Sequence, residues 1–262
     1  MNELQRIRQG ALPRAPGEKE LIKDTGWAER AQKGFLASGI DPLDRRGYKN
    51  DYIDLLQKAA LEEVLELRGD EVVLDFGCGS GRVSHWIAPR VKRVIGLEVT
   101  PEMIEMAKEN RVTDNVEFML YDGFHFPALP VPIDLIFSIG VLQIMELERL
   151  KEALSQLKKY LKSGGKLYLI EQASDNPKVG RLPVQHYLRA FEDTGLTCLR
   201  YYPIRRGRWW GLYLIRYGIV PRILFPKIAQ KEILLRRREA RPGSYYKDYL
   251  FVLKAVGFKR NG

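Results

Sequence analysis

A short apolar run that ends in a glycine-rich turn is the feature that most constrains how this chain can fold. The run Glu71-Val-Val-Leu-Asp75 predicts a buried strand, and the turn Gly77-Cys-Gly-Ser-Gly81 follows it before a helix predicted at 83–91. Parallel strands that are buried on both faces form continuous apolar runs. Glycines allow a tight turn and a close approach of the backbone to a ligand. This order therefore predicts a parallel sheet with a ligand site at the turn.

The alternation of strand and helix continues along the chain. Helices are predicted at 51–67, 100–110, 147–161 and 183–194, the first of them amphipathic. The further strands are predicted at 93–98, 116–120, 133–139, 166–171, 197–202 and 248–255. This pattern predicts an α/β fold: a Rossmann-like, seven-stranded, mostly parallel sheet with helices on both faces.

Acidic residues follow the first three predicted strands. A dinucleotide fingerprint G-x-G-x-x-G would need glycine at position 82, where the chain has Arg82. Asp75 would repel a pyrophosphate and suits a cationic ligand. Glu98 can accept hydrogen bonds from both hydroxyls of a ribose, and Asp122 can accept from an exocyclic amine. The three acids predict a site for a cationic nucleoside.

These segments together resemble the class I S-adenosylmethionine-dependent methyltransferases. The matching segments are 73–82, 95–103, 116–123, 134–142 and 161–169. The resemblance covers about residues 50–202, and 248–256 fits the last strand. It implies S-adenosylmethionine as the cofactor and methyl transfer as the reaction.

The resemblance also implies a set of cofactor-binding residues, which lie at strand ends and in the loops that follow them. They are Asp75, Phe76, Gly77, Gly79, Gly81, Glu98, Val99, Asp122, Gly123 and Ser138.

Each part of the cofactor has its own residues in this interpretation. Asp75 and Gly77 would border the amino-acid end, Glu98 would hold the ribose, and Val99 would pack on the adenine. Asp122 with Gly123 would address the adenine edge, and Ser138 with Ile139 would line the floor near the methyl group.

The segment 45–52 precedes the first core helix. In members of the resembling family this region often closes over the cofactor, so Tyr48, Lys49 and Tyr52 can contact the methionine carboxylate or the acceptor. The alternative is a plain helix N-terminus.

We divide the chain into an N-terminal arm or lid (1–50), with a helix near 25–37, and an S-adenosylmethionine-binding core (51–202). A basic, aromatic-rich insertion (203–247) and the last strand with the C-terminus (248–262) follow.

The methyl acceptor is less constrained. Nucleic-acid amino-methyltransferases of the resembling superfamily carry an Asp/Asn-Pro-Pro-Tyr/Phe motif after the fourth strand, where this chain has Ser138-Ile-Gly-Val-Leu-Gln-Ile144. The Pro-Cys pair of cytosine-C5 enzymes is missing too, and we interpret Cys78 as a packing residue. We therefore expect O-methylation of a small molecule or glycan, with a membrane-linked acceptor as one option.

Two histidines are candidates for a catalytic base that takes the acceptor proton. His186 ranks first because it lies after the fifth strand, in a region that usually faces the acceptor in the resembling family, and His125 ranks second. A surface or capping role is the alternative for each. We expect no metal site, because no cluster of His, Cys and acids has metal-ligand spacing.

Positive charge is concentrated in the last quarter of the chain. The formal net charge is +10, but residues 200–262 hold 16 Lys and Arg against three acids, so they carry +13 and the first 199 residues carry −3. The insertion can lie on anionic lipid, form an acceptor lid or dimer surface, bind RNA, or simply pack as a subdomain with a charged outer face. An RNA methyltransferase is therefore an alternative function, and a non-catalytic cofactor-binding or assembly partner is another.

Localisation follows from what the sequence lacks. Residues 1–20 contain no apolar signal region, and no uninterrupted apolar stretch reaches the roughly 18 residues of a membrane-spanning helix. Two cysteines cannot form a disulfide framework. We expect a cytoplasmic protein that can associate peripherally with a membrane.

Overall fold

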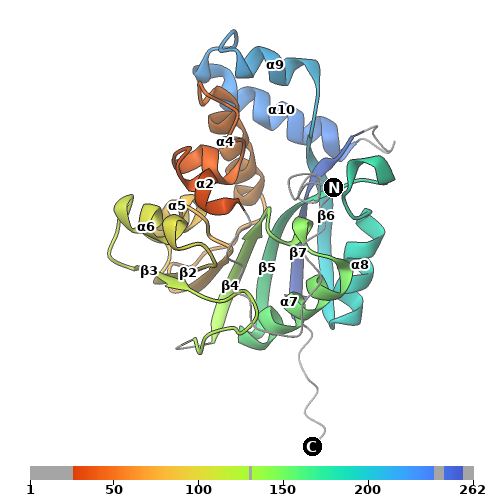
Figure 1. Cartoon of the computed structure of the whole chain (residues 1–262). Helices are drawn as coiled ribbons and strands as arrows, with labels where there is room; N and C mark the ends of the chain where they lie inside the picture. Colours follow the sequence, from red (N-terminus) through yellow and green to blue (C-terminus); the bar gives the residue numbers. More distant parts are fainter. Residues whose placement is uncertain (1–25, 130–131, 239–244, 256–262) are drawn as a thin grey trace, which may run out of the picture.

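Seven strands form one sheet in the order β3-β2-β1-β4-β5-β7-β6 (Figure 1). In the computed structural model, which describes residues 26–129, 132–238 and 245–255, the strands β1 (Val72–Phe76), β2 (Arg93–Glu98), β3 (Val116–Leu120), β4 (Ile133–Ile139) and β5 (Leu161–Ala173) are parallel. The last strand, β7 (Lys247–Ala255), lies antiparallel between β5 and β6 (Leu196–Arg206). The predicted seven-stranded, mostly parallel sheet is confirmed.

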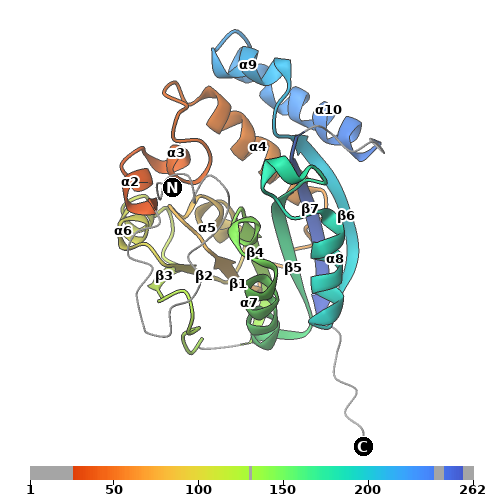
Figure 2. The same cartoon turned by 45° about the vertical axis from the view of Figure 1, so that its right-hand side comes forward.

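Helices cover both faces of this sheet (Figure 2). One face packs on α4 (Tyr48–Glu62), α5 (Arg82–Ile87) and α6 (Pro101–Glu109), and the other packs on α7 (Leu147–Tyr160) and α8 (Val184–Asp193). Each face has its own apolar core, as the alternating side chains of a strand require. Along β1, for example, Val73 belongs to the first core and Leu74 to the second.

Three predicted helices differ in the structure, and the first, expected at 51–67, is α4 (Tyr48–Glu62). The helix expected at 83–91 ends at Ile87 and continues as the 3₁₀ turn η1 (Ala88–Arg90), which contains Pro89. Proline has no N–H to donate, so it does not continue an α-helix. The helix expected near 25–37 is two short helices, α2 (Trp27–Ala31) and α3 (Phe35–Gly39), separated by Gly34 at φ 100°.

The junction between α7 and β5 differs from the expectation. We expected the helix to end at the glycine pair 164–165, whereas α7 ends at Tyr160 and β5 begins at Leu161. The register of β5 on β4 shifts between residues 161 and 166, so the glycines lie in an irregularity inside the strand. A Cβ at Gly165 would lie 3.0 Å from the carbonyl oxygen of Asp134, so the close approach of two strands explains this glycine.

The basic insertion packs on the first core helix. Strand β6 extends to Arg206, and the helices α9 (Trp210–Arg216) and α10 (Phe225–Arg237) then pack against α4 (Figure 1). The 3₁₀ turn η4 (Arg222–Leu224) leads into α10.

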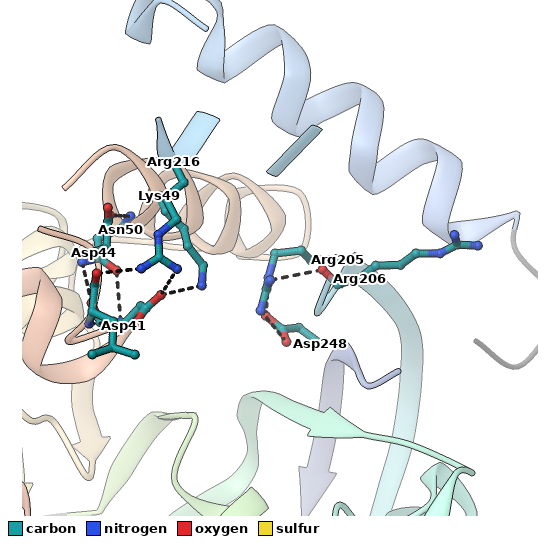
Figure 3. A network of polar contacts seen from close by, with 9 residues as sticks. Asp41, Asp44, Lys49, Asn50, Arg205, Arg206, Arg216 and Asp248 are labelled. Carbon is teal, nitrogen blue, oxygen red and sulfur yellow. Dashed lines mark hydrogen bonds and ion pairs between the residues drawn. The ribbon is translucent and has the colours of Figure 1, made fainter. Parts of the chain in front are cut away.

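Ion pairs hold the insertion against α4 and the segment before it, among them one between Arg237 and Glu63. The Arg216 guanidinium lies 3.5 Å from the Asp41 carboxylate, which also binds Lys49 at 2.6 Å (Figure 3). Arg222 reaches Asp51 at 2.5 Å. Part of the basic excess of the last quarter therefore neutralises acids of the N-terminal part.

Within the described ranges, every helix is too short or too polar to cross a membrane.

Candidate functional site

The glycine turn lies at the carboxyl end of β1, beside the loop that follows β4. Gly77 has φ 68°, and a Cβ there would lie 2.4 Å from Cγ2 of Val141, so only glycine fits between the two loops. Gly79 has φ 53°, and a Cβ there would meet nothing within 4 Å. The turn therefore has one tightly packed glycine and one whose backbone faces open space.

Glu98 ends β2 and holds the glycine turn through its carboxylate. The N–H of Gly79 donates to Oε2 at 3.0 Å, and the N–H groups of Val99 and Thr100 donate to Oε1 at 2.9 and 3.1 Å. The side chain is buried, and burial raises the pKa of Glu98 above its usual range.

Asp75 lies near Glu98, at the end of β1. The hydroxyl of Ser84 donates to Oδ2 at 2.6 Å, and burial raises the pKa of Asp75 to about 6. The negative charge of Glu98 adds to this rise, whereas the charge of Arg82 opposes it. Two buried carboxyls whose charged forms are disfavoured make a site that a cation would stabilise.

Phe76 contributes little side chain to this site. Its ring is buried and stacks on Phe126 at 5.4 Å between centroids, as part of the core on the α7 side. Any contact from Phe76 at the glycine turn would come from its backbone.

The loop after β3 brings together two residues to which the sequence had given separate roles. Oδ1 of Asp122 accepts from the N–H groups of Phe124 and His125 at 2.8 and 2.7 Å, and Oδ2 lies 2.6 Å from Nδ1 of His125. These hydrogen bonds lower the pKa of Asp122 to about 2. The His125 side chain is 79% exposed. Arg149 of α7 donates to the carbonyl oxygen of Gly123, which holds this loop against α7.

Glu171 is a buried acid that the sequence analysis missed. It lies on β5, and its Oε1 accepts from the N–H groups of Val141 and Leu142 at 3.3 and 3.1 Å and from the Ser138 hydroxyl at 3.3 Å. Gln143 N–H donates to Oε2 at 3.0 Å. Glu171 therefore fixes the end of β4 at Ser138 and the loop that follows it. The signal was an acid near the end of an apolar strand, the same signal that identified Glu98.

Glu171 gives a prediction for stability against pH. Burial raises its pKa in the folded protein to about 8, against about 4.3 in an unfolded chain. The contribution of protonated Glu171 to the free energy of unfolding is therefore fully present below about pH 4 and is lost as the pH rises through 8. We expect Glu171→Gln to gain about 3 °C or more in unfolding midpoint, relative to the unmodified chain, between pH 5 and pH 9. Thermal unfolding followed by circular dichroism measures this difference.

Glu102→Gln is the matched control, because Glu102 is an exposed acid on α6. Its difference from the unmodified chain should stay constant over the same pH range. Parallel pH profiles for the two variants would show that Glu171 has an ordinary pKa.

Tyr48 and Tyr52, which were expected near the cofactor or the acceptor, contact the insertion. The guanidinium of Arg222 lies 4.1 Å above the Tyr48 ring, and the hydroxyl of the fully buried Tyr52 donates to Oε2 of Glu232 on α10 at 2.6 Å. Both rings therefore face the insertion. They lie four residues apart on one side of α4, and that side is covered by chain some 170–180 residues away.

The other side of α4 faces the glycine turn through an ion pair. Arg82, just after the turn, donates to Asp54 at 2.9 Å and to Gln57 at 2.7 Å. The chain departs from a dinucleotide fingerprint at this arginine, which is buried and ties α5 to α4. Ser80 donates to the carbonyl oxygen of Phe35 at 2.6 Å, so α3 also lies beside the turn.

A hollow lies beyond the carboxyl end of β5, next to the start of β7. It is a shallow depression that is open to solvent. Its lining residues are Ala173, Ser174, Asp175, Val184, Tyr245, Lys247 and Tyr249. His186 lies in the first turn of α8, two residues after Val184, and its Nδ1 is buried with no hydrogen-bond partner.

Cys78 and His85 are buried and pack against other parts of the core. Cys78 is buried, and burial raises the pKa of its thiol well above the usual range, which favours a packing role. His85 packs its ring near Phe118, with Nε2 2.9 Å from the carbonyl oxygen of Ala107. The described part of the chain holds no group of three or more His, Cys, Asp or Glu able to bind a metal ion.

Comparison with known proteins agrees with this geometry. Residues 73–165 match the family model described as "Methyltransferase domain". The chain is 28% identical to a malonyl-[acyl-carrier protein] O-methyltransferase of Hamiltonella defensa, over 70% of this chain and 72% of that protein. It is 30% identical to an uncharacterized methyltransferase of Geobacillus thermodenitrificans, over 56% of this chain and 69% of that protein.

A solved structure shares the fold. It is geranyl diphosphate C-methyltransferase from Streptomyces coelicolor A3(2) in complex with Mg²⁺, geranyl diphosphate and S-adenosyl-L-homocysteine. The TM-score is 0.57 at 17% identity, with 85% of this chain and 87% of that chain covered.

Proposed function

We propose an acceptor class for this chain, which belongs to the class I S-adenosylmethionine-dependent methyltransferases and uses S-adenosylmethionine as its methyl donor. The acceptor is an oxygen atom of a small molecule or glycan. The observation that carries this choice is the hollow beyond β5 and β7, whose lining mixes two tyrosines and a valine with polar and charged groups. The chain also lacks an Asp/Asn-Pro-Pro-Tyr/Phe motif after β4, which supports an acceptor other than a nucleic-acid amine.

The cofactor would lie at the carboxyl ends of β1, β2 and β3. The open backbone at Gly79 leaves room for a ligand, and the buried carboxyls of Asp75 and Glu98 suit a cationic one. Asp75 would face the amino-acid end, Glu98 the ribose, and Asp122 with Gly123 the adenine edge. S-adenosylmethionine supplies a methyl group on a sulfonium, which is open to attack by an electron pair of the acceptor.

The loop after β4 connects the two parts of the site. It touches the glycine turn through Val141, and it is tied to β5 through Glu171. The side chain of Gln143 accepts from the N–H of Gln172 at 2.7 Å, directly before the residues that line the hollow. Glu171 would therefore act as a positioning residue that keeps the floor of the cofactor site in register with the acceptor side. Alignment of this kind supplies much of the rate in a two-substrate reaction.

An alcohol or phenol acceptor must lose a proton when its oxygen is methylated. His186 is the first candidate to accept it, because it follows Val184, a lining residue of the hollow, by two positions in α8 and its Nδ1 has no hydrogen-bond partner. His125 is the second candidate, since Asp122 orients its ring, as a general base requires.

The acceptor class is tested by incubating the full chain with methyl-labelled S-adenosylmethionine and fractionated lipid, small-molecule, glycan, RNA and protein extracts. We expect label in a small-molecule, glycan or lipid fraction, with mass spectrometry locating the methyl group on oxygen. The name of the Hamiltonella relative, an O-methyltransferase, supports this outcome.

Other outcomes would overturn the proposal. Label in RNA, with an RNA affinity that falls steeply between low and physiological salt, would establish an RNA methyltransferase that uses the basic quarter. Cofactor binding with no label in any fraction would establish a non-catalytic cofactor-binding or assembly partner.

A further inference from the structure

The insertion exposes large apolar side chains at one end of the molecule. Ile223 is 85% exposed, Trp210 75% and Ile219 64%. Tyr213, Tyr217 and Leu224 are also exposed, between 45% and 59%. Single exposed apolar residues are ordinary, but six within 15 positions of one segment mark an interaction surface.

These side chains follow from the local structure. Trp210, Tyr213 and Tyr217 are spaced by three and four residues along α9 and its C-terminus, so they share the side of the helix that faces away from α4. Ile219, Ile223 and Leu224 follow in the connection to α10, and Figures 1 and 2 show α9 at the outer end of the molecule. We call the six residues 210, 213, 217, 219, 223 and 224 the apolar tip.

The insertion's own sequence carries mostly positive charge, of which Arg216 and Arg222 are paired with Asp41 and Asp51. Between Gly207 and Arg238 the chain has eight Lys and Arg and one acid, Glu232. Glu232 is buried and accepts from the Tyr52 hydroxyl, so it does not contribute to the surface. The exposed stripe of α10 contains Lys227 and Lys231, for which the described residues supply no acidic partner. The outer surface of the insertion is therefore apolar and cationic.

We propose that the apolar tip and the adjacent α10 stripe form a docking surface for an anionic lipid bilayer. Tryptophan and tyrosine settle at the headgroup level, isoleucine and leucine enter the acyl boundary, and lysines attract acidic headgroups. The insertion supplies all three kinds of side chain within one continuous segment of the chain. This proposal does not depend on which atom accepts the methyl group.

Two other occupants fit this surface less well. RNA would use aromatic rings and phosphate-binding cations, but it offers no partner for the exposed Ile219, Ile223 and Leu224. A second copy of the chain would bring its own lysines against Lys227 and Lys231 in a self-complementary contact, and like charges across an interface disfavour it.

Vesicle co-sedimentation of the full chain tests the proposal. Vesicles of phosphatidylcholine alone are compared with vesicles in which about a third of the lipid is phosphatidylglycerol. At physiological salt we expect at least tenfold tighter binding to the anionic vesicles. Ile219→Ser with Ile223→Ser, and separately Lys227→Glu with Lys231→Glu, should each weaken this binding at least fivefold.

The matched control is Val112→Ser with Lys108→Glu, which changes an exposed apolar and an exposed basic residue near the end of α6. It should bind vesicles like the unmodified chain. Cofactor affinity and unfolding temperature should be unchanged in all three variants, which separates this test from that of the acceptor. Equal binding to both vesicle types, no binding, equal losses in the control, or tighter binding to single-stranded RNA than to anionic vesicles would each overturn the proposal.

Discussion

We expect Glu98→Ala to weaken S-adenosylmethionine binding by roughly 10- to 100-fold. Glu98 is the acid at the end of β2, and both of its oxygens are held in place by backbone N–H groups of the glycine turn and of residues 99 and 100. A hydrogen bond to a charged group contributes about 1.5–3 kcal/mol, which corresponds to this change in the dissociation constant. The alanine also removes a negative charge beside Asp75, where the cationic end of the cofactor would lie. Isothermal titration calorimetry measures the change.

The control for Glu98 is an acid on the neighbouring strand. Glu117 lies on β3, and its half-exposed side chain pairs with Arg93 on the surface. Glu117→Ala should leave the dissociation constant for S-adenosylmethionine within about twofold. The side chain lies on the surface, and the loss of a surface ion pair disturbs the fold little. A folded Glu98→Ala protein that binds S-adenosylmethionine as tightly as the unmodified chain would remove Glu98 from the cofactor site.

Local sequence patterns predicted the strands that build this site. The bounds of β2, β3 and β4 agree with the expected 93–98, 116–120 and 133–139, because each is a buried apolar run between turn residues. The positions of Glu98 and Asp122 at the sheet edge followed directly. Glu171 was accessible to the same reasoning, since it too lies near the carboxyl end of an apolar strand.

Contacts between parts of the chain far apart in sequence could not be predicted from local patterns. Tyr48 and Tyr52 were expected near the cofactor or the acceptor because this region often closes over the cofactor in the resembling family. Their partners, Arg222 and Glu232, lie in a segment that no periodicity connects to α4. A helix covered on several sides is usually apolar on each of them. In α4 the buried positions include Asn50, Tyr52 and Gln57, so the spacing of its aliphatic residues indicated only one covered side.

The pairing of the basic residues in the last quarter could not be predicted from the sequence either. Their total charge suggested an anionic partner, yet Arg216 and Arg222 pair with Asp41 and Asp51. Arg205 forms a buried pair inside the sheet. A sum over residues does not separate cations that stabilise the fold from those that remain exposed, such as Lys227 and Lys231. Only burial and pairing make that distinction.

The buried pair between Arg205 and Asp248 gives the largest expected effect on stability. The guanidinium donates to both carboxylate oxygens, at 2.8 and 3.0 Å, across the paired strands β6 and β7 (Figure 3). Both side chains are 3% exposed. Breaking such a pair leaves an unpaired buried charge, which costs about 3–5 kcal/mol. We expect Arg205→Met or Asp248→Leu alone to lower the unfolding midpoint by about 10 °C.

A double variant distinguishes a buried charge from lost packing. Arg205→Met with Asp248→Leu removes both charges and keeps apolar volume, so it should recover most of the stability that either single variant loses. Glu117→Gln, which breaks a half-exposed pair, should shift the midpoint far less. If the double variant instead loses the sum of the single effects, the two residues act independently. Such additive losses would mean that packing around β6 and β7, rather than the ion pair, stabilises the pairing of these two strands.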